Sequence, residues 1–123
     1  MSTVELTQDS FESTIAGDGI VIVDWWASWC GPCMAFAPVY ESVSSRHPDI
    51  VFAKVDTEAE MDLSAAAQIQ SIPTLMIFRD GILVFRQSGA LPEDALEDIL
   101  GQARGLDMDQ VRAAVAEAEA ANA

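Results

Sequence analysis

The segment IVIVDWWASWCGPC, residues 20–33, decides the fold of this chain. Residues 20–27 are an almost unbroken apolar run, which is typical of a central strand buried on both faces of a sheet. Two cysteines follow at once, Cys30 and Cys33, and they are the only two in the chain. Because a helix is predicted to begin at Pro32, the cysteines lie at the junction between a buried strand and a helix.

Outward from this junction, hydrophobic periodicity predicts alternating helices and strands. We expect helices at residues 7–16, 32–46, 58–69 and 92–105, and strands at residues 20–27, 50–55, 74–78 and 82–85. Crossover connections imply parallel strand pairs, and the turn at residues 79–81 predicts a hairpin that adds an antiparallel edge. The predicted fold class is therefore α/β, a three-layer sandwich with a mixed central sheet and helices on both faces.

The last eighteen residues differ in composition from the rest of the chain. Residues 1–105 are expected to form one domain, and residues 106–123, rich in alanine and glutamate, a C-terminal helical extension. Asp107 and Gln110 are spaced as a capping box at its start. Its apolar stripe is thin, so the helix either packs on the domain or frays.

Composition excludes several functions. The net charge is −14, from 20 acidic against 6 basic residues, and nucleic acid and anionic membrane surfaces repel such a chain. No apolar run approaches the roughly 18 residues that would cross a bilayer. Residues 1–5 lack the features of a secretion signal. We therefore expect a cytoplasmic protein, whose thiols are kept reduced.

A reactive dithiol is the favoured interpretation of the cysteine pair. A disulfide that closes two intervening residues adds little stability. A zinc site needs about four ligands, and His47 is the only histidine, so we expect no metal. Two inert buried thiols are the third alternative, but Trp29 and the helix start favour exposure. At the helix start, free N–H groups and the dipole stabilise a Cys30 thiolate, while Cys33 lies one turn deeper.

The chain resembles the thioredoxin family over residues 4–105. The resemblance rests on WCGPC at residues 29–33 behind a strand that carries Asp24, with Ile72-Pro73-Thr74 about forty residues further on. It also includes residues 37–38, 53–56, 80–81 and 89–91. It implies a protein-disulfide reductase in which Cys30 attacks the substrate and Cys33 resolves the mixed disulfide.

Asp24 and Lys54 are the predicted supporting pair. Burial raises the pKa of a carboxyl group, so Asp24 is expected to exchange protons near pH 7 and to accept the proton of Cys33, through a water. Lys54, on the adjacent strand, is expected to offset part of that charge. The plainer alternatives are an aspartate that reaches water and an exposed strand lysine.

The resemblance also implies a docking face and partners. Pro73 is expected to be cis and stacked against the dithiol. The apolar docking face is expected to comprise Trp29, Gly31, Pro32, Ile72, Pro73, Gly89 and Ala90. Electrons would come from NADPH through a flavin-dependent thioredoxin reductase, with no bound cofactor, and the substrates would be disulfide-containing proteins reduced by a monomer.

Two positions depart from the family pattern. Met34 follows the second cysteine, where a basic residue is frequent, and Ser88 stands before Gly89, where a branched apolar residue is common. Both lie near the predicted docking face and leave partner choice open. Two other functions stay open as well: a binding module for one dedicated protein, and a disulfide oxidase or isomerase.

Overall fold

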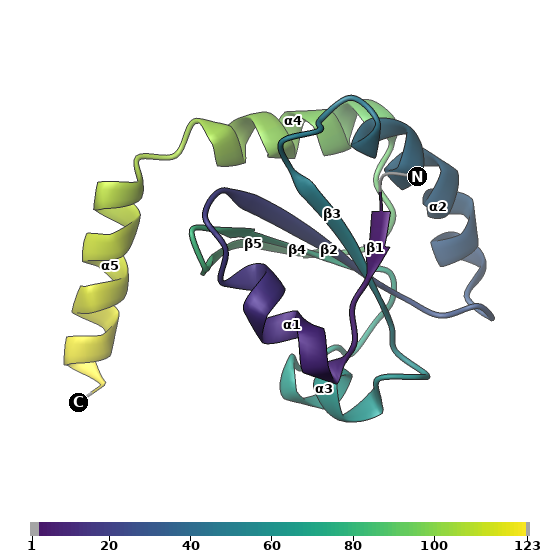
Figure 1. The fold of residues 1–123 in the computed structure, drawn as a ribbon, viewed down its shortest axis with the longest axis horizontal. Helices are drawn as coiled ribbons and strands as arrows, with labels where there is room; N and C mark the ends of the chain where they lie inside the picture. Colours follow the sequence, from purple (N-terminus) through teal and green to yellow (C-terminus); the bar gives the residue numbers. More distant parts are fainter. Residues whose placement is uncertain (1–2, 123) are drawn as a thin grey trace.

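A five-stranded mixed sheet forms the centre of the molecule (Figure 1). The computed structural model describes residues 3–122. The strands are β1 (Thr3–Glu5), β2 (Ile20–Trp26), β3 (Val51–Asp56), β4 (Thr74–Arg79) and β5 (Ile82–Ser88). The helices are α1 (Gln8–Ile15), α2 (Gly31–Ser44), α3 (Met61–Ala66), α4 (Glu93–Arg104) and α5 (Met108–Ala121). Residues 1–2, part of the segment inspected for a secretion signal, lie outside the described residues, as does Ala123.

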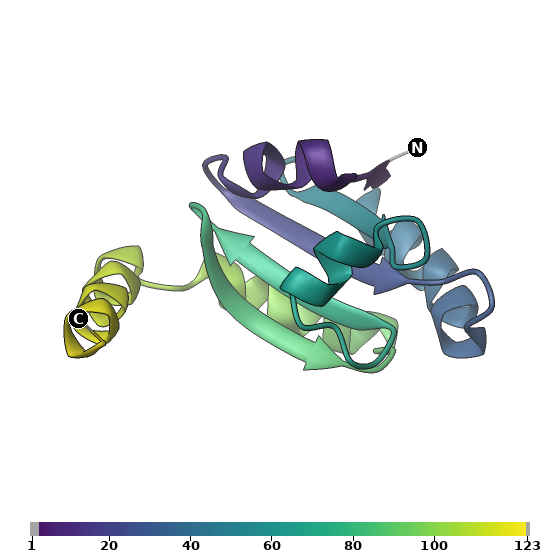
Figure 2. The same cartoon turned by 90° about the horizontal axis from the view of Figure 1, so that it is seen from below.

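The sheet has the order β1-β3-β2-β4-β5, and helices cover both of its faces. Helices α1 and α3 lie on one face, onto which Figure 2 looks, and α2 and α4 lie on the other. Each face has its own apolar core, and β2 contributes alternate residues to both. The predicted three-layer α/β sandwich is confirmed.

The strand directions correct one part of the prediction. Strands β1, β3 and β2 are parallel, but β4 is antiparallel to β2 as well as to β5. Helix α3 has six residues, not the twelve predicted, and therefore spans about 9 Å. Strand β3 spans about 20 Å, so α3 is too short to return the chain to the edge where β3 began. Strand β4 therefore starts near the end of β3 and runs in the opposite direction.

Two local features shorten α3. At its start, the Asp56 carboxylate accepts hydrogen bonds from the backbone N–H groups of Glu58 and Ala59, which holds this segment in a turn. At its end, Gln68 adopts a left-handed conformation with φ 58°, and the Arg86 guanidinium donates to the Ala67 carbonyl at 2.7 Å. Strand β1 was not predicted, because three residues carry too little periodicity to be recognised.

The extension forms a helix that is anchored at its first turn. Asp107 caps α5 by accepting hydrogen bonds from two backbone N–H groups, while Gln110 contributes its backbone N–H and no side-chain bond among the described contacts. Met108 is buried, and Arg112 pairs with Asp80 at 3.7 Å. Beyond this turn α5 stands out from the domain (Figure 1), and an apolar groove of about 360 Å³ separates it from β5. The division into residues 1–105 and 106–123 stays a prediction.

None of the helices within residues 3–122 combines the length and apolar character that a membrane span requires.

One arginine fixes the end of α4 and the turn into α5. The Arg79 guanidinium donates to the carbonyl oxygens of Ala103, Arg104 and Leu106 at 2.9, 3.1 and 2.8 Å. The Ala103 carbonyl also accepts the Leu106 N–H at 3.5 Å, and the arginine supplements such contacts where the helix ends and regular helical partners are lacking.

We therefore expect Arg79→Ala to lower the free energy of unfolding of the full chain by roughly 2 kcal/mol, the scale of charged hydrogen bonds. Arg112→Ala, which removes two exposed or half-exposed ion pairs, with Asp80 and with Asp109, is the control and should cost less than about 1 kcal/mol. Urea denaturation measures both. Equal losses in the two variants would show that Arg79 is not the anchor.

Candidate active site

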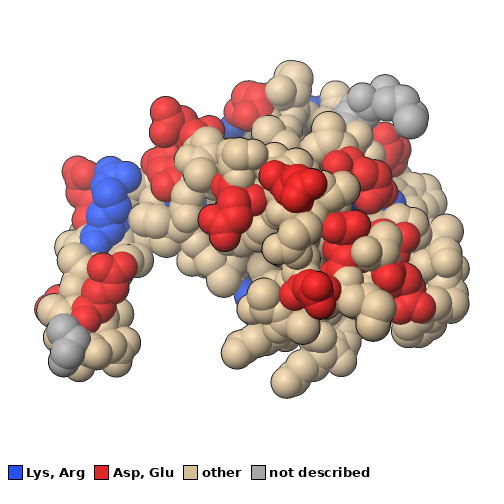
Figure 3. Space-filling model, turned by 60° about the horizontal axis from the view of Figure 1, so that its bottom comes forward, with Lys and Arg blue, Asp and Glu red and all other residues tan. Residues whose placement is uncertain are grey.

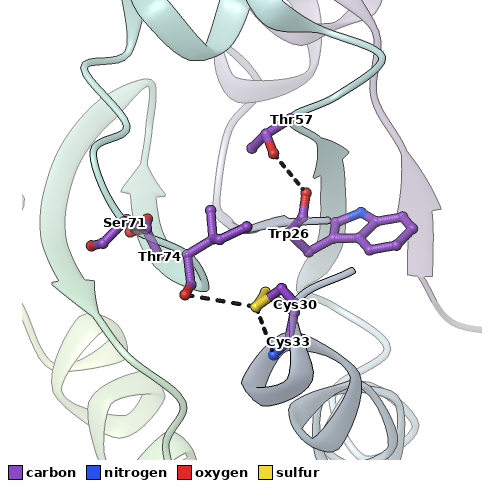
Figure 4. The surroundings of a disulfide bond; sticks show 7 residues. Trp26, Cys30, Cys33, Thr57, Ser71 and Thr74 are labelled. Carbon is purple, nitrogen blue, oxygen red and sulfur yellow. Dashed lines mark hydrogen bonds between the residues drawn. A yellow bond between two sulfur atoms is a disulfide. The ribbon is translucent and has the colours of Figure 1, made fainter. Parts of the chain in front are cut away.

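The cysteine pair lies at the junction of β2 and α2, as predicted. Cys30 is the N-cap of α2, and its Sγ accepts the backbone N–H of Cys33 at 3.2 Å (Figure 4). The two cysteines are joined in a disulfide, with their Cα atoms 5.2 Å apart. In the same view, Thr57 donates its hydroxyl to the Trp26 carbonyl at 3.1 Å, which fixes the end of β2. The sulfur that would carry thiolate charge therefore already faces a helix-start N–H group.

Both cysteines are more enclosed than the sequence suggested. Cys30 is 5% exposed and Cys33 is 2% exposed, so the two cysteines differ little in exposure. The prediction that Cys30 is exposed is therefore wrong for the disulfide form. They form a small apolar cluster with Ala27, against which Trp26 and Ile72 pack. The Ile72 carbonyl oxygen lies 3.8 Å from the Cys30 Sγ. A partner therefore reaches the sulfur only along the edge of this cluster.

The turn at residues 72–73 lies against the dithiol. The Ile72–Pro73 peptide bond is cis, which confirms that expectation. Pro73 is buried, so it supports the predicted docking face from behind, while Ile72 is half-buried. The Pro73 carbonyl accepts the N–H of Gly89 at 2.8 Å, and Gly89 has φ 101°, a conformation that favours glycine. Gly89 and the neighbouring Ala90 are both exposed beside this turn.

Trp29, Gly31 and Pro32 lie on the exposed side of the dithiol. Trp29 is 69% exposed, and its indole N–H donates to the Glu58 carboxylate at 3.1 Å. This contact joins the cysteine loop to the segment before α3, and sequence reasoning missed Glu58 because it depends on how two loops meet. Met34 is also exposed, on the first turn of α2.

Asp24 is fully buried within the sheet. It shares a face of β2 with Ile22, so it lies on the side covered by α2. Neither carboxylate oxygen has a hydrogen-bond partner among the described residues. Burial raises the pKa of Asp24 to about 7; the Lys54 ammonium lowers it and the Glu5 carboxylate raises it further. A buried acid with a pKa of about 7 therefore lies on the strand that leads to the cysteine pair, six residues before Cys30.

The positive charge of Lys54 lowers the pKa of Asp24, although in the described part of the chain no ion pair joins the two side chains. The two are direct partners in the β2–β3 register, as expected for adjacent strands. The Lys54 ammonium instead lies over the Trp26 ring, 4.7 Å from the ring centre.

Glu5 is a charged neighbour that sequence reasoning missed. It is the register partner of Lys54 on the other side, so three adjacent strands place Glu5, Lys54 and Asp24 in one row. Glu5 enters this row through β1, and that strand was not predicted. Partial burial raises the pKa of Glu5, while Lys54 lowers it.

The pair lacks the companions that a metal site would need. Within residues 3–122, no three histidine, cysteine, aspartate or glutamate side chains gather as a set of metal ligands. His47 lies beyond the C-terminal end of α2, away from the cysteines at its start, and contacts Glu97.

Comparison with known proteins identifies this arrangement. The thioredoxin family model matches residues 2–102. The chain belongs to the thioredoxin family. It is 58% identical to putative thioredoxin 2 of Streptomyces coelicolor, over 97% of this chain and 89% of that protein. It is 42% identical to thioredoxin C-3 of Corynebacterium nephridii, over 83% of this chain and 71% of that protein.

Solved thioredoxins have the same fold. Plasmodium falciparum thioredoxin superposes with a TM-score of 0.74 at 34% identity, over 81% of this chain and 97% of its own. The thioredoxin of Malassezia sympodialis gives a TM-score of 0.75 at 30% identity, over 83% of this chain and 90% of its own. This thioredoxin-family protein is a thiol-disulfide oxidoreductase with a redox-active cysteine pair, and the family works without a metal cofactor.

The raised pKa of Asp24 makes stability depend on pH. Because the folded-state pKa of about 7 exceeds the ordinary aspartate value of 3.8, the folded protein holds the proton more tightly than the unfolded chain. The stability that the protonated Asp24 carboxyl contributes is fully present below about pH 4 and is lost as the pH rises to about 7. The difference corresponds to about 4 kcal/mol.

Asp24→Asn removes this titration and leaves a side chain of similar size. We expect the free energy of unfolding of the wild type to fall by about 4 kcal/mol relative to Asp24→Asn between pH 4 and pH 8. Denaturant unfolding of the oxidised proteins across this range measures the difference. A difference that does not change with pH would contradict the raised pKa.

Proposed function

We propose that this protein reduces disulfides in other proteins, with Cys30 as the nucleophile, Cys33 as the resolving thiol and Asp24 as the proton acceptor. The observation that carries the proposal is the cysteine pair at the start of α2, preceded by the strand in which the Asp24 carboxyl is buried. A helix start supplies the stabilisation that a thiolate needs, and a carboxyl with a pKa of about 7 can take up a proton at neutral pH.

In the first step, the Cys30 thiolate of the reduced protein attacks one sulfur of the substrate disulfide. A bond forms between Cys30 and that sulfur, the substrate disulfide breaks, and the other substrate sulfur leaves as a thiolate. The N–H of Cys33 lies within hydrogen-bonding distance of the Cys30 sulfur and supports its negative charge before the attack.

In the second step, Cys33 releases the substrate. The Asp24 carboxylate accepts the thiol proton of Cys33, directly or through a water, and the Cys33 thiolate attacks the Cys30 sulfur. The Cys30–Cys33 disulfide forms and the second substrate sulfur leaves as a thiolate. Two electrons have then passed to the substrate. Lys54 supports the step because its positive charge favours the ionised form of Asp24.

The return of the protein to its dithiol form requires a two-electron donor. We assign this part to a flavin-dependent thioredoxin reductase that draws on NADPH, so the chain itself needs no bound cofactor. A reducing, cytoplasmic location and a monomeric state complete the proposal, since a reductant of protein disulfides must itself be kept reduced.

The docking face is proposed to consist of Trp29, Gly31, Pro32, Ile72, Gly89 and Ala90, with the buried Pro73 as its support from behind. Gly89 and Ala90 lie on the loop that follows β5. An extended substrate segment could pair with backbone groups of Ile72 beside the sulfurs. Acidic side chains are spread across the face shown in Figure 3, with few basic ones between them, which supports protein partners rather than nucleic acid or anionic lipid.

The test is insulin reduction driven by NADPH and a bacterial thioredoxin reductase. We expect the wild type to be active, Cys30→Ser to be inactive, and Cys33→Ser to accumulate a covalent mixed disulfide visible by mass spectrometry, because the resolving thiol is missing.

Correct folding of each variant, checked by circular dichroism, is the control. A folded wild type that does not reduce insulin would overturn the proposal. Full biological activity of both cysteine variants would instead favour a binding module.

A further inference from the structure

Three hydroxyl groups connect the turn at residues 72–73 to the end of β5. The Ser71 hydroxyl donates to the Ser88 hydroxyl at 2.9 Å. The Thr74 hydroxyl donates to the Ser71 carbonyl at 2.6 Å and lies 3.4 Å from the Ser88 hydroxyl. Thr74 and Ser88 are register partners in the β4–β5 ladder. The cluster therefore fixes the position of the Ser88 hydroxyl relative to the dithiol turn.

The proton count of this cluster leaves one donor free. The single hydroxyl proton of Thr74 goes to the Ser71 carbonyl, and that of Ser71 goes to Ser88. The proton of Ser88 has only the 3.4 Å contact to Thr74, which is long for a hydrogen bond between hydroxyls. A closer acceptor on another molecule would therefore accept a hydrogen bond from the Ser88 hydroxyl.

The free donor is hydrogen-bonded to the residue next to Ile72, which contacts the reacting sulfur, and it is open to partners. Ser71 and Ser88 are exposed, whereas Thr74 is buried. Ser71 directly precedes Ile72, whose carbonyl oxygen is 3.8 Å from the Cys30 Sγ. Ser88 directly precedes Gly89, which is hydrogen-bonded to Pro73. These contacts place the Ser88 hydroxyl on the same turn that a segment docking at Cys30 would have to meet.

We propose that Ser88 is a specificity-determining residue that donates a hydrogen bond to a side-chain oxygen flanking the attacked cysteine. The protein then prefers disulfide segments with hydroxyl-bearing flanks, such as threonine, over segments with branched apolar flanks. A valine flank leaves the Ser88 donor without a partner when the segment displaces water, and this carries a cost. The inference rests on the proposed function, because it concerns the substrate of that same site.

The test uses two disulfide peptides that differ only in threonine or valine on both sides of each cysteine, since these side chains have the same shape. The measured quantity is the second-order rate constant for peptide reduction by the pre-reduced full chain, so no reductase is involved. We expect the wild type to prefer the threonine peptide by about fivefold, the effect of one hydrogen bond.

Two variants of Ser88 separate the hydroxyl from the shape of the side chain. Ser88→Val should abolish or reverse the preference, and Ser88→Thr should keep it. Both are β-branched residues suited to a strand, and unfolding curves confirm their folding. The dithiol redox potential should be the same in the wild type and both variants. A general disturbance of the site would change this potential.

A threonine-to-valine rate ratio that is the same in the wild type and Ser88→Val would overturn the inference while leaving the proposed function intact. A folded wild type that reduces neither peptide would count against the proposed function itself.

Discussion

The coverage of β2 by helices on both faces is the constraint on which the rest of the molecule depends. Every side chain that this strand carries before Trp26 is removed from water, and Asp24 is no exception. The burial that makes β2 a central strand therefore also raises the pKa of Asp24 to about 7. The same strand delivers Cys30 to the first turn of α2. Fold stability and proton chemistry thus share one physical origin.

The dithiol is enclosed by loops that come from distant parts of the sequence. Ile72 covers the Cys30 sulfur from one side, and Glu58 holds Trp29 on the other through its indole N–H. The hydrogen bond from Gly89 to Pro73 joins a further loop to this assembly. Access to the sulfur is therefore narrow, and a substrate must be extended enough to lie across the turn. This enclosure suits a protein that exchanges disulfides with specific partners, because it protects its own sulfurs from non-specific reaction.

Much of this arrangement could be predicted from the sequence, because it depends on contiguous patterns. The apolar run before Cys30 and Cys33 places the pair at a strand-to-helix junction, and adjacency of strands places Lys54 beside Asp24. Glu5 could not be predicted, since a three-residue strand carries too little pattern. The antiparallel direction of β4 follows from the short α3, which ends early for reasons of loop geometry. The contacts of Glu58 and Ser88 depend on how separate loops meet, and no local pattern reports that.

The dithiol–disulfide potential of the full chain tests the central claim most directly, because the account makes the Cys30–Cys33 pair a reductant. Equilibration with glutathione or a thioredoxin of known potential, followed by mass spectrometry of thiol-alkylated protein, gives the value. The account predicts about −270 mV, the value typical of thioredoxin itself. A potential near −180 mV or higher, in the range of isomerases and oxidases, would contradict it.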